Sequence, residues 1–391
     1  MKNKFVKIAT PLLMALLLTG CWDSVEIDKK AFVSAVAIDV GKDIDKKDEG
    51  IDFFNMDEDD RENLSIVKVT YDFPDIRNMD TQKGTTEKLY LSVDGYSLSD
   101  AYIKATSKTS RSLHFGHSKL LLLSEEVYNY PSLVNEFMDY IERTPSINRA
   151  MMMAIVEGST EDYLKSKPMQ EDGVDNYITN LLRNNRDNGS FKPVTVTKYI
   201  DMVKSDNLAI LPIFKLKGEN DIELIGGAII EDYTIKDKIS KSEMDNIQIL
   251  DGDVGACKKV ITNETHPIDY YIENVNTDMQ VKYEDDKLYI NYNVDAEGDL
   301  SGYYSGAKSI DNMDIQNIES EFSDTIEKEL LNTIHKVKDD MEIDILGIKS
   351  SLEKYHPMIW KKVKDDWPRA LNESVVSVSV DCKIRTIGIS N

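Results

Sequence analysis

The chain has 391 residues and a formal net charge of −23, with 70 acidic and 47 basic side chains. That excess of negative charge argues against binding to nucleic acid and against electrostatic adsorption to anionic lipids. The length exceeds what one hydrophobic core usually supports, so two or three domains are expected.

The first 27 residues have the pattern of an export signal. Lys2, Lys4 and Lys7 precede an apolar run over 8–18, which is too short to cross a bilayer and is followed by small residues. The run ends in Leu18-Thr19-Gly20-Cys21, which resembles a bacterial lipobox. In that interpretation residues 1–20 are removed and the thiol of Cys21 carries a diacylglycerol, so that acyl chains hold the protein on a membrane outside the cytoplasm. The alternative is an ordinary cleaved signal with an incidental cysteine.

Strand and helix patterns alternate after the signal, which predicts an N-terminal α/β domain over 21–198. The segment 42–62 is dense in charge and is expected to be a solvated loop. Ser97 or Ser99 is a candidate helix cap. The predicted strands are 31–39, 64–73, 87–93, 113–123 and 149–156. The predicted helices are 97–110, 131–143, 160–166 and 172–185.

A run of Asn, Gly, Pro and Thr over 187–197 predicts a linker to a small middle domain at 199–265. That domain is expected to hold paired strands at 208–217 and 222–231 and a helix near 240–250. A C-terminal domain follows at 266–391, with strands over 269–304, long amphipathic helices at 315–341 and 347–364, and a last strand at 374–387. Trp367-Pro368 is expected to end the second helix. The fold class is therefore α+β (mixed α/β), with three domains that each have a small sheet and flanking helices.

The residues that could carry chemistry do not form a recognisable catalytic or metal site. His114 and His117 are expected on opposite faces of a strand, which disfavours a shared metal. The acidic runs 57–60 and 251–253 lack the order of a calcium loop and are expected to be solvated. Gly95 to Ser99 lacks the last glycine of a nucleophile elbow, and Gly226-Gly227 fits a strand bulge rather than a phosphate loop. No catalytic residue, metal or cofactor is therefore predicted.

Cys257 and Cys382 remain once Cys21 is lipidated. They form a disulfide or are two buried free thiols.

Four stretches form an ordered set along the mature chain. They are Cys21-Trp22-Asp23 with Glu26-Ile27 and 31–39; 115–119 with Ser124-Glu125-Glu126; Ile213-Phe214 with 224–228; and Trp367-Pro368 with Val378, Val380 and 383–388. Read together and in this order, they resemble the Ger(x)C lipoprotein family, the C subunits of GerA-type spore germinant receptors. Two departures are Ser24-Val25, where the family usually has arginines, and the acidic segment 42–62, which looks like an insertion.

The resemblance implies three α/β domains, no enzymatic activity, and a place on the outer face of the spore inner membrane. It implies partners as well, namely a multi-spanning A subunit and a transporter-like B subunit that together sense small germinants. The alternative function is an extracytoplasmic solute-binding lipoprotein, which usually has two similar lobes.

Overall fold

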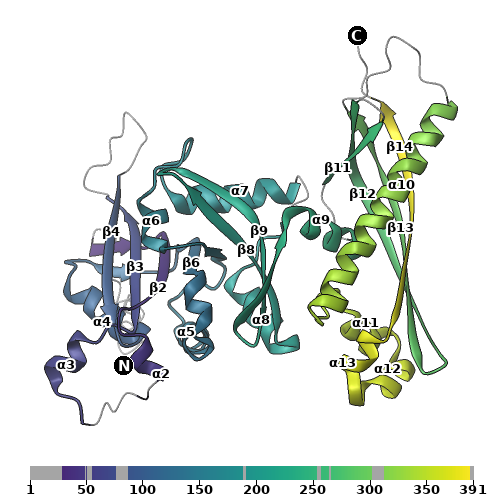
Figure 1. Ribbon diagram of the computed structural model, residues 1–391. Helices are drawn as coiled ribbons and strands as arrows, with labels where there is room; N and C mark the ends of the chain where they lie inside the picture. The colour runs from purple at the N-terminus through teal and green to yellow at the C-terminus, as the bar shows by residue number, and fades with distance from the viewer. Residues whose placement is uncertain are drawn as a thin grey trace, which may run out of the picture.

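The computed structural model describes residues 29–48, 50, 55–75, 87–187, 191–252, 257–263, 266–301 and 312–387. Its strands form sheets of two, eight and four strands, and helices flank them (Figure 1). The mixed α/β character expected from the sequence is confirmed.

The eight-stranded sheet occupies the first two thirds of the chain. Its strand order is β10-β9-β8-β7-β6-β2-β3-β4. The central strands β2, β6, β7 and β8 run parallel, and both margins are antiparallel. The strands are β2 (Ala35–Val40), β3 (Val67–Pro74), β4 (Lys88–Gly95), β6 (Leu120–Ser124), β7 (Met152–Val156), β8 (Leu208–Lys217), β9 (Asp221–Glu231) and β10 (Thr234–Ser240).

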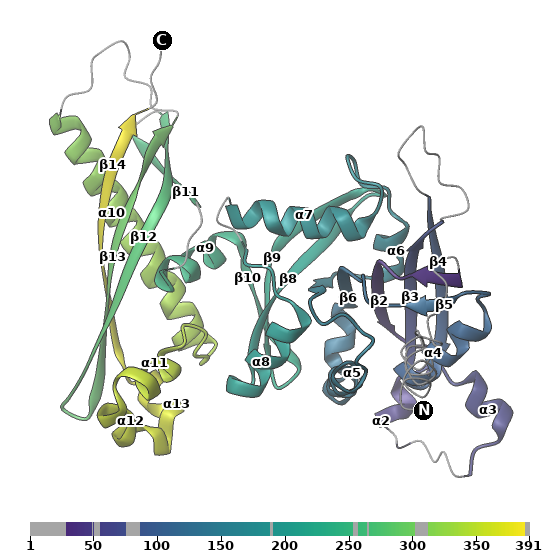
Figure 2. The same cartoon turned by 180° about the vertical axis from the view of Figure 1, so that it is seen from behind.

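Helices cover both faces of this sheet, which explains why β6 and β7 are continuous apolar runs. Four consecutive leucines, Leu120 to Leu123, are at most 1% exposed. On one face lie α4 (Leu98–Ser107) and α5 (Pro131–Arg143), and on the other lie α6 (Thr160–Lys165) and α7 (Val174–Asp187), while α8 (Val196–Asp206) packs on β7 and β8 (Figure 2). The short helices α2 (Asp45–Asp48), α3 (Glu58–Asn63) and η3 (Glu125–Asn129) lie in connections.

Several predicted elements match the structure. Helix α5 has the predicted bounds, begins with Pro131 and buries the predicted apolar stripe. Ser97, one of the two candidate caps, accepts a hydrogen bond from the backbone N–H of Asp100 at 3.2 Å. Strand β9 has a register shift opposite Ile213 and Phe214 just after Leu224, which is the bulge expected beside Gly226.

Other predictions are wrong in part. The expected strand 31–39 is divided into β1 (Lys30–Phe32) and β2, and the expected strand 113–123 into β5 (Ser112–His114) and β6. β1 and β5 pair with each other as the two-stranded parallel sheet. The described part of the charged segment 42–62 contains α2 and α3 rather than only loop, and α8, for which no helix was predicted, begins at Val196 near the end of the expected linker.

The strands expected in a separate middle sheet extend the N-terminal sheet instead. β7 pairs with β8 at Ile155–Ile213 and Val156–Phe214, across the proposed boundary at residue 199. The sheets therefore do not follow the proposed domains one by one, and the domain boundaries remain a prediction.

The four-stranded sheet has the order β11-β12-β13-β14 and is covered on one face by a long helix (Figure 1). α10 (Asn312–His335) places Ile318, Phe322, Ile326, Leu330 and Ile334 against it. The strands are β11 (Cys257–Asn263), β12 (His266–Glu284), β13 (Lys287–Ser301) and β14 (Val375–Ile387).

The helices between α10 and β14 differ from the prediction. α10 passes into the π-helical turn η4 (Lys336–Asp340). The predicted helix 347–364 is two helices, α11 (Ile348–Tyr355) and α12 (Pro357–Val363), because Pro357 starts a new helix. A short turn, η5 (Lys364–Asp366), follows α12. Trp367-Pro368 then begins a further helix, α13 (Trp367–Asn372), so the prediction that this pair ends a helix is wrong.

Candidate functional site

The first described residues, 29–34, form a corner of the fold together with residues 112–119, here called the N-terminal corner. Two stretches that were singled out in the sequence, 31–39 and 115–119, meet there. β1 pairs with β5 from Lys30–Ser112 to Phe32–His114, and Val33 N donates to His114 O at 3.0 Å. Cys21 itself lies outside the described residues.

Ser118 closes this corner. It is 1% exposed, and its hydroxyl donates to Val33 O at 2.9 Å. Next to it, Lys119 N donates to Ser34 O at 2.8 Å, and Asn148 Nδ2 donates to Ser118 O at 2.9 Å. The turn 115–119 interrupts an otherwise apolar run, and its hydrogen bonds connect β1 to the eight-stranded sheet.

His114 and His117 lie together, so the prediction that they point to opposite faces of one strand is wrong. β5 ends at His114, and His117 belongs to the following turn. Their ring centroids are 5.8 Å apart, and both rings contact Phe32, at 5.4 and 5.8 Å. Burial, together with Lys30 and His117, lowers the pKa of His114. The described residues contain no group of three or more His, Cys, Asp or Glu side chains that could hold a metal.

Basic side chains line one side of the corner. A cleft of about 210 Å³ lies between β1, the end of β3 and the loop after α4. Lys30, Lys108 and Arg111 line it together with apolar Phe32 and Leu89. Asp75 lines the cleft as well, so three basic side chains and one acidic side chain face it.

A second hollow, of about 570 Å³, lies at the carboxyl ends of the parallel strands β2, β6 and β7. Ligands often bind at this edge of an α/β sheet. Asp39, which lines this hollow, accepts from Thr160 N at 2.9 Å and from Thr160 Oγ1 at 2.7 Å, and Glu157, just after β7, pairs with Lys215 and Lys238 at 3.0 and 3.1 Å. The lysines hold the pKa of Glu157 below its usual value. These groups stabilise the edge and are poorly suited to proton transfer.

An ion cluster that sequence reasoning missed is buried between β3, β4 and α7. Lys88 Nζ lies 3.0 Å from Asp72 Oδ2 and 2.8 Å from Asp175 Oδ1, and both carboxylate side chains are 2% exposed. The other oxygen of Asp72, Oδ1, has no hydrogen-bond partner among the residues that the structure describes. Burial raises the pKa of Asp72 to about 6. Asp72 lies in the predicted strand 64–73, and Lys88 lies in the predicted strand 87–93. The only sign of this ion cluster in the sequence was therefore a charged residue within the alternating pattern of each strand.

Cys257 and Cys382 are free and buried, which decides between the two alternatives left open by the sequence. They lie on β11 and β14, the two margins of the four-stranded sheet. Three interstrand spacings separate those margins, about 14 Å, which is too far for a disulfide. Burial raises the pKa of both thiols, to about 12 for Cys257 and about 11 for Cys382.

The remaining acidic runs show no site. Asp57 caps α3 without a side-chain hydrogen bond, and Glu58, Asp59 and Asp60 form its exposed first turn. Asp253 lies outside the described residues. In the part of the chain that the structure describes, no helix is both long and apolar enough to cross a membrane.

Comparisons with known proteins agree along the whole chain. Residues 23–216 match the family described as the spore germination protein N-terminal domain, and residues 225–388 match the spore germination B3/GerAC-like C-terminal family. Spore germination protein YndF of Bacillus subtilis is 21% identical over 99% of this chain and 98% of its own length. Spore germination protein A3 of the same organism is 23% identical, over 93% of this chain and 92% of its own.

The solved structure of the GerBC protein supports the fold. It superposes with a TM-score of 0.58 at 15% identity, covering 82% of this chain and 93% of that one. The described residues do not form the two similar lobes of a solute-binding lipoprotein, because one of their sheets has eight strands and another has four.

The two family matches together cover nearly all of the sequence that follows Cys21. The family is one of germinant receptor subunits and not of known enzymes. The chain belongs to the GerAC-like spore germination proteins, the family of germinant receptor C subunits.

Proposed function

We propose that this chain is a lipid-anchored, non-catalytic subunit of a nutrient germinant receptor. In this function a diacylglycerol on Cys21 holds the folded part on the outer face of the spore inner membrane. The observation that carries the proposal is the cysteine at the end of an export signal, in a chain whose family is that of receptor C subunits.

The distance between anchor and fold supports close tethering. Lys29, the first described residue, is eight positions along the chain from Cys21. At no more than about 3.5 Å per position, this stretch spans at most about 28 Å. The N-terminal corner, beside the cleft that Lys30, Lys108 and Arg111 line, is thus the part of the fold held nearest to the bilayer, where acidic headgroups attract basic side chains.

Tethering explains how a subunit without catalytic groups contributes to a receptor. Confinement to a thin layer raises the effective concentration of the ectodomain for membrane-embedded A and B subunits, so weak contacts suffice for assembly. The paired strands and turn at the N-terminal corner supply a rigid surface beside the membrane for such contacts.

The test replaces Cys21 by alanine, with Ser24→Ala as the matched control in the same segment. Mass spectrometry of the control is expected to find a diacylglyceryl-cysteine at the new N-terminus. Spores with Cys21→Ala are expected to lose the C subunit from the inner membrane and to germinate slowly with one class of germinant. An unmodified N-terminus in the control, or normal germination of the Cys21→Ala strain when redundant receptors are deleted, contradicts the proposal.

A further inference from the structure

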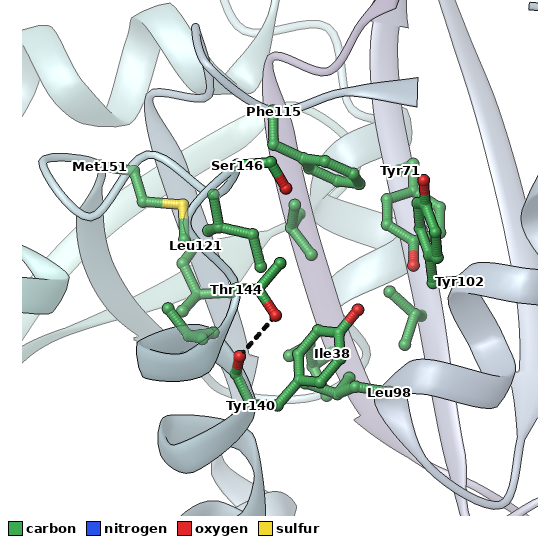
Figure 3. A pocket seen from close by; sticks show the side chains of 14 residues that line it. Ile38, Tyr71, Leu98, Tyr102, Phe115, Leu121, Tyr140, Thr144, Ser146 and Met151 are labelled. Carbon is green, nitrogen blue, oxygen red and sulfur yellow. Dashed lines mark hydrogen bonds between the residues drawn. The ribbon is translucent and has the colours of Figure 1, made fainter. Parts of the chain in front are cut away.

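An apolar pocket of about 120 Å³ opens beside the N-terminal corner, between the sheet and helices α4 and α5 (Figure 3). Ile38, Val69 and Leu121 form its buried floor, at most 1% exposed. Phe115, the first residue of the turn that closes the corner, lines it as well, and its ring lies 5.8 Å from that of Tyr71. A dry apolar cavity of about 150 Å³ is large enough to bind benzene, so this pocket has room for roughly one six-membered ring.

Polar groups reach into this apolar space without protein partners. Tyr71 is 4% exposed, and its hydroxyl makes no hydrogen bond within the described residues. Tyr102, on α4, also lines the pocket with a hydroxyl that lacks a partner there. Figure 3 shows these two rings on one side of the pocket and Met151 and Leu121 on the other. Neither hydroxyl is fully buried, so both face space that a ligand with a hydrogen-bonding group can enter.

The pocket is also reachable. Ser146 at its rim is exposed, and Tyr140 and Thr144 beside it are half-buried. Thr144 is held in place because its hydroxyl donates to Tyr140 O at 2.7 Å at the end of α5 (Figure 3). A small molecule can therefore enter from the loop after α5 without unfolding either helix.

We propose that this pocket binds a small uncharged molecule that has an apolar body about one ring in size and one hydrogen-bonding group. The lining contains no Asp, Glu, Lys, Arg or His side chain. A free amino acid would bury its ammonium and carboxylate groups without a counter-charge, at a cost of several kcal/mol for each, so amino acids are excluded from this site. The inference rests on the pocket alone and is independent of the lipid anchor.

The test uses the full chain in lipid nanodiscs and two fluorine-labelled probes, 4-fluorophenol and fluorobenzene, observed by fluorine NMR with empty nanodiscs as the blank. Both probes are expected to bind, the phenol more tightly. Tyr71→Phe removes one hydrogen-bonding group, so we expect about a 3- to 10-fold loss of affinity for 4-fluorophenol and no change for fluorobenzene. Val36→Phe, which places a ring in the pocket from strand β2, is expected to abolish binding of both probes.

The matched control is Tyr292→Phe. Tyr292 is 2% exposed and its hydroxyl also has no partner, but it lies in the four-stranded sheet, away from the pocket. This change is expected to leave both affinities unaltered. Absence of binding by either probe overturns the proposal, as does binding that persists in Val36→Phe. An equal loss in Tyr71→Phe and Tyr292→Phe overturns the assignment of the hydroxyl.

Discussion

Ser118 shows how much one small side chain holds in place at the N-terminal corner. Its buried hydroxyl satisfies the carbonyl of Val33 at the break between β1 and β2. Ser118→Ala leaves that carbonyl without its hydroxyl donor, and we expect a loss of about 1 to 3 kcal/mol in the free energy of unfolding. Urea denaturation measures it. Ser112→Ala is the control, because Ser112 is exposed and bonds Lys29 O at only 3.3 Å; an equal loss in both variants would refute the role given to Ser118.

Asp72 provides a prediction on pH. Its pKa is raised to about 6 in the folded protein from an ordinary value of 3.8, because burial outweighs the attraction of Lys88. The folded state therefore binds this proton more tightly than the unfolded state, so stability is present at low pH and is lost as the pH rises through 6. Two pKa units correspond to about 3 kcal/mol.

Asp72→Asn should abolish this fall between pH 4 and 6, which denaturation at a series of pH values measures. Asp245→Asn is the comparison, because burial raises the pKa of Asp245 to about 7 at a separate place, between α9 (Lys241–Leu250) and β11. The Asp245→Asn variant should still lose stability between pH 4 and 6, because Asp72 is unchanged. It should lack the further decline in stability that continues to pH 7. Identical pH profiles for wild type and Asp72→Asn would show that the carboxylate is not protonated in the folded state.

Some of these local contacts could be predicted from the sequence alone, and others could not. The cap at Ser97 and the bulge near Gly226 were predictable, because each depends on local backbone chemistry. The contact between His114 and His117 was not, since the apolar run 120–123 made the whole of 113–123 look like one strand. The cluster joins Lys88 to Asp72 and also to Asp175, 87 positions further along the chain, and no local pattern encodes such a pairing.

At the scale of elements, β9 depends on a glycine. Gly226 has φ of +152°, and a Cβ there would lie 2.0 Å from Ile239 O of the neighbouring strand β10. Gly226→Ala therefore forces the two strands apart, and we expect a cost of about 3 kcal/mol in unfolding free energy. Gly218→Ala is the matched control, since Gly218 has φ of +67° with nothing within 4 Å, and only the backbone penalty of about 1 kcal/mol applies. Equal losses in the two variants would contradict the close approach.

Elements with a strong period were predicted well, and those that depend on tertiary contacts were not. α5 and β8 have the predicted bounds, because a helical stripe and an alternating run are visible locally. β10 was missed because its pattern, Thr-Ile-Lys-Asp-Lys-Ile-Ser, is mostly polar, and it is a strand only because it completes the margin of the sheet beside β9. α8 was missed as well, since no element was assigned between the expected linker 187–197 and the strand that begins at Leu208.

At the scale of the molecule, the chain has two hydrophobic cores, and each core includes residues from the unit that forms the other core. One core runs from Ala31 to Ile247 and the other from Ile249 onward. α9 (Lys241–Leu250) extends the first unit, yet its last residues Ile249 and Leu250 belong to the second core. In return Ile343, which follows the π-helical turn η4, is buried in the first core at 5% exposure. An ion pair at 2.7 Å between Lys336 and Glu243 lies beside this exchange.

This exchange predicts that the two units unfold together and that Ile343 couples them. Ile343→Ala removes apolar contacts from the first core although the residue belongs to the second unit, and we expect a loss of about 2 to 4 kcal/mol. Because the coupling is weakened, calorimetry should show one thermal transition in the wild type and two in the variant. Ile103→Ala is the control, since Ile103 is 61% exposed and its truncation should leave a single transition. A single, merely shifted transition in Ile343→Ala would mean that α9 and the pair of Lys336 with Glu243 suffice to join the units, and that the insertion of Ile343 stabilises the first core without coupling it to the second.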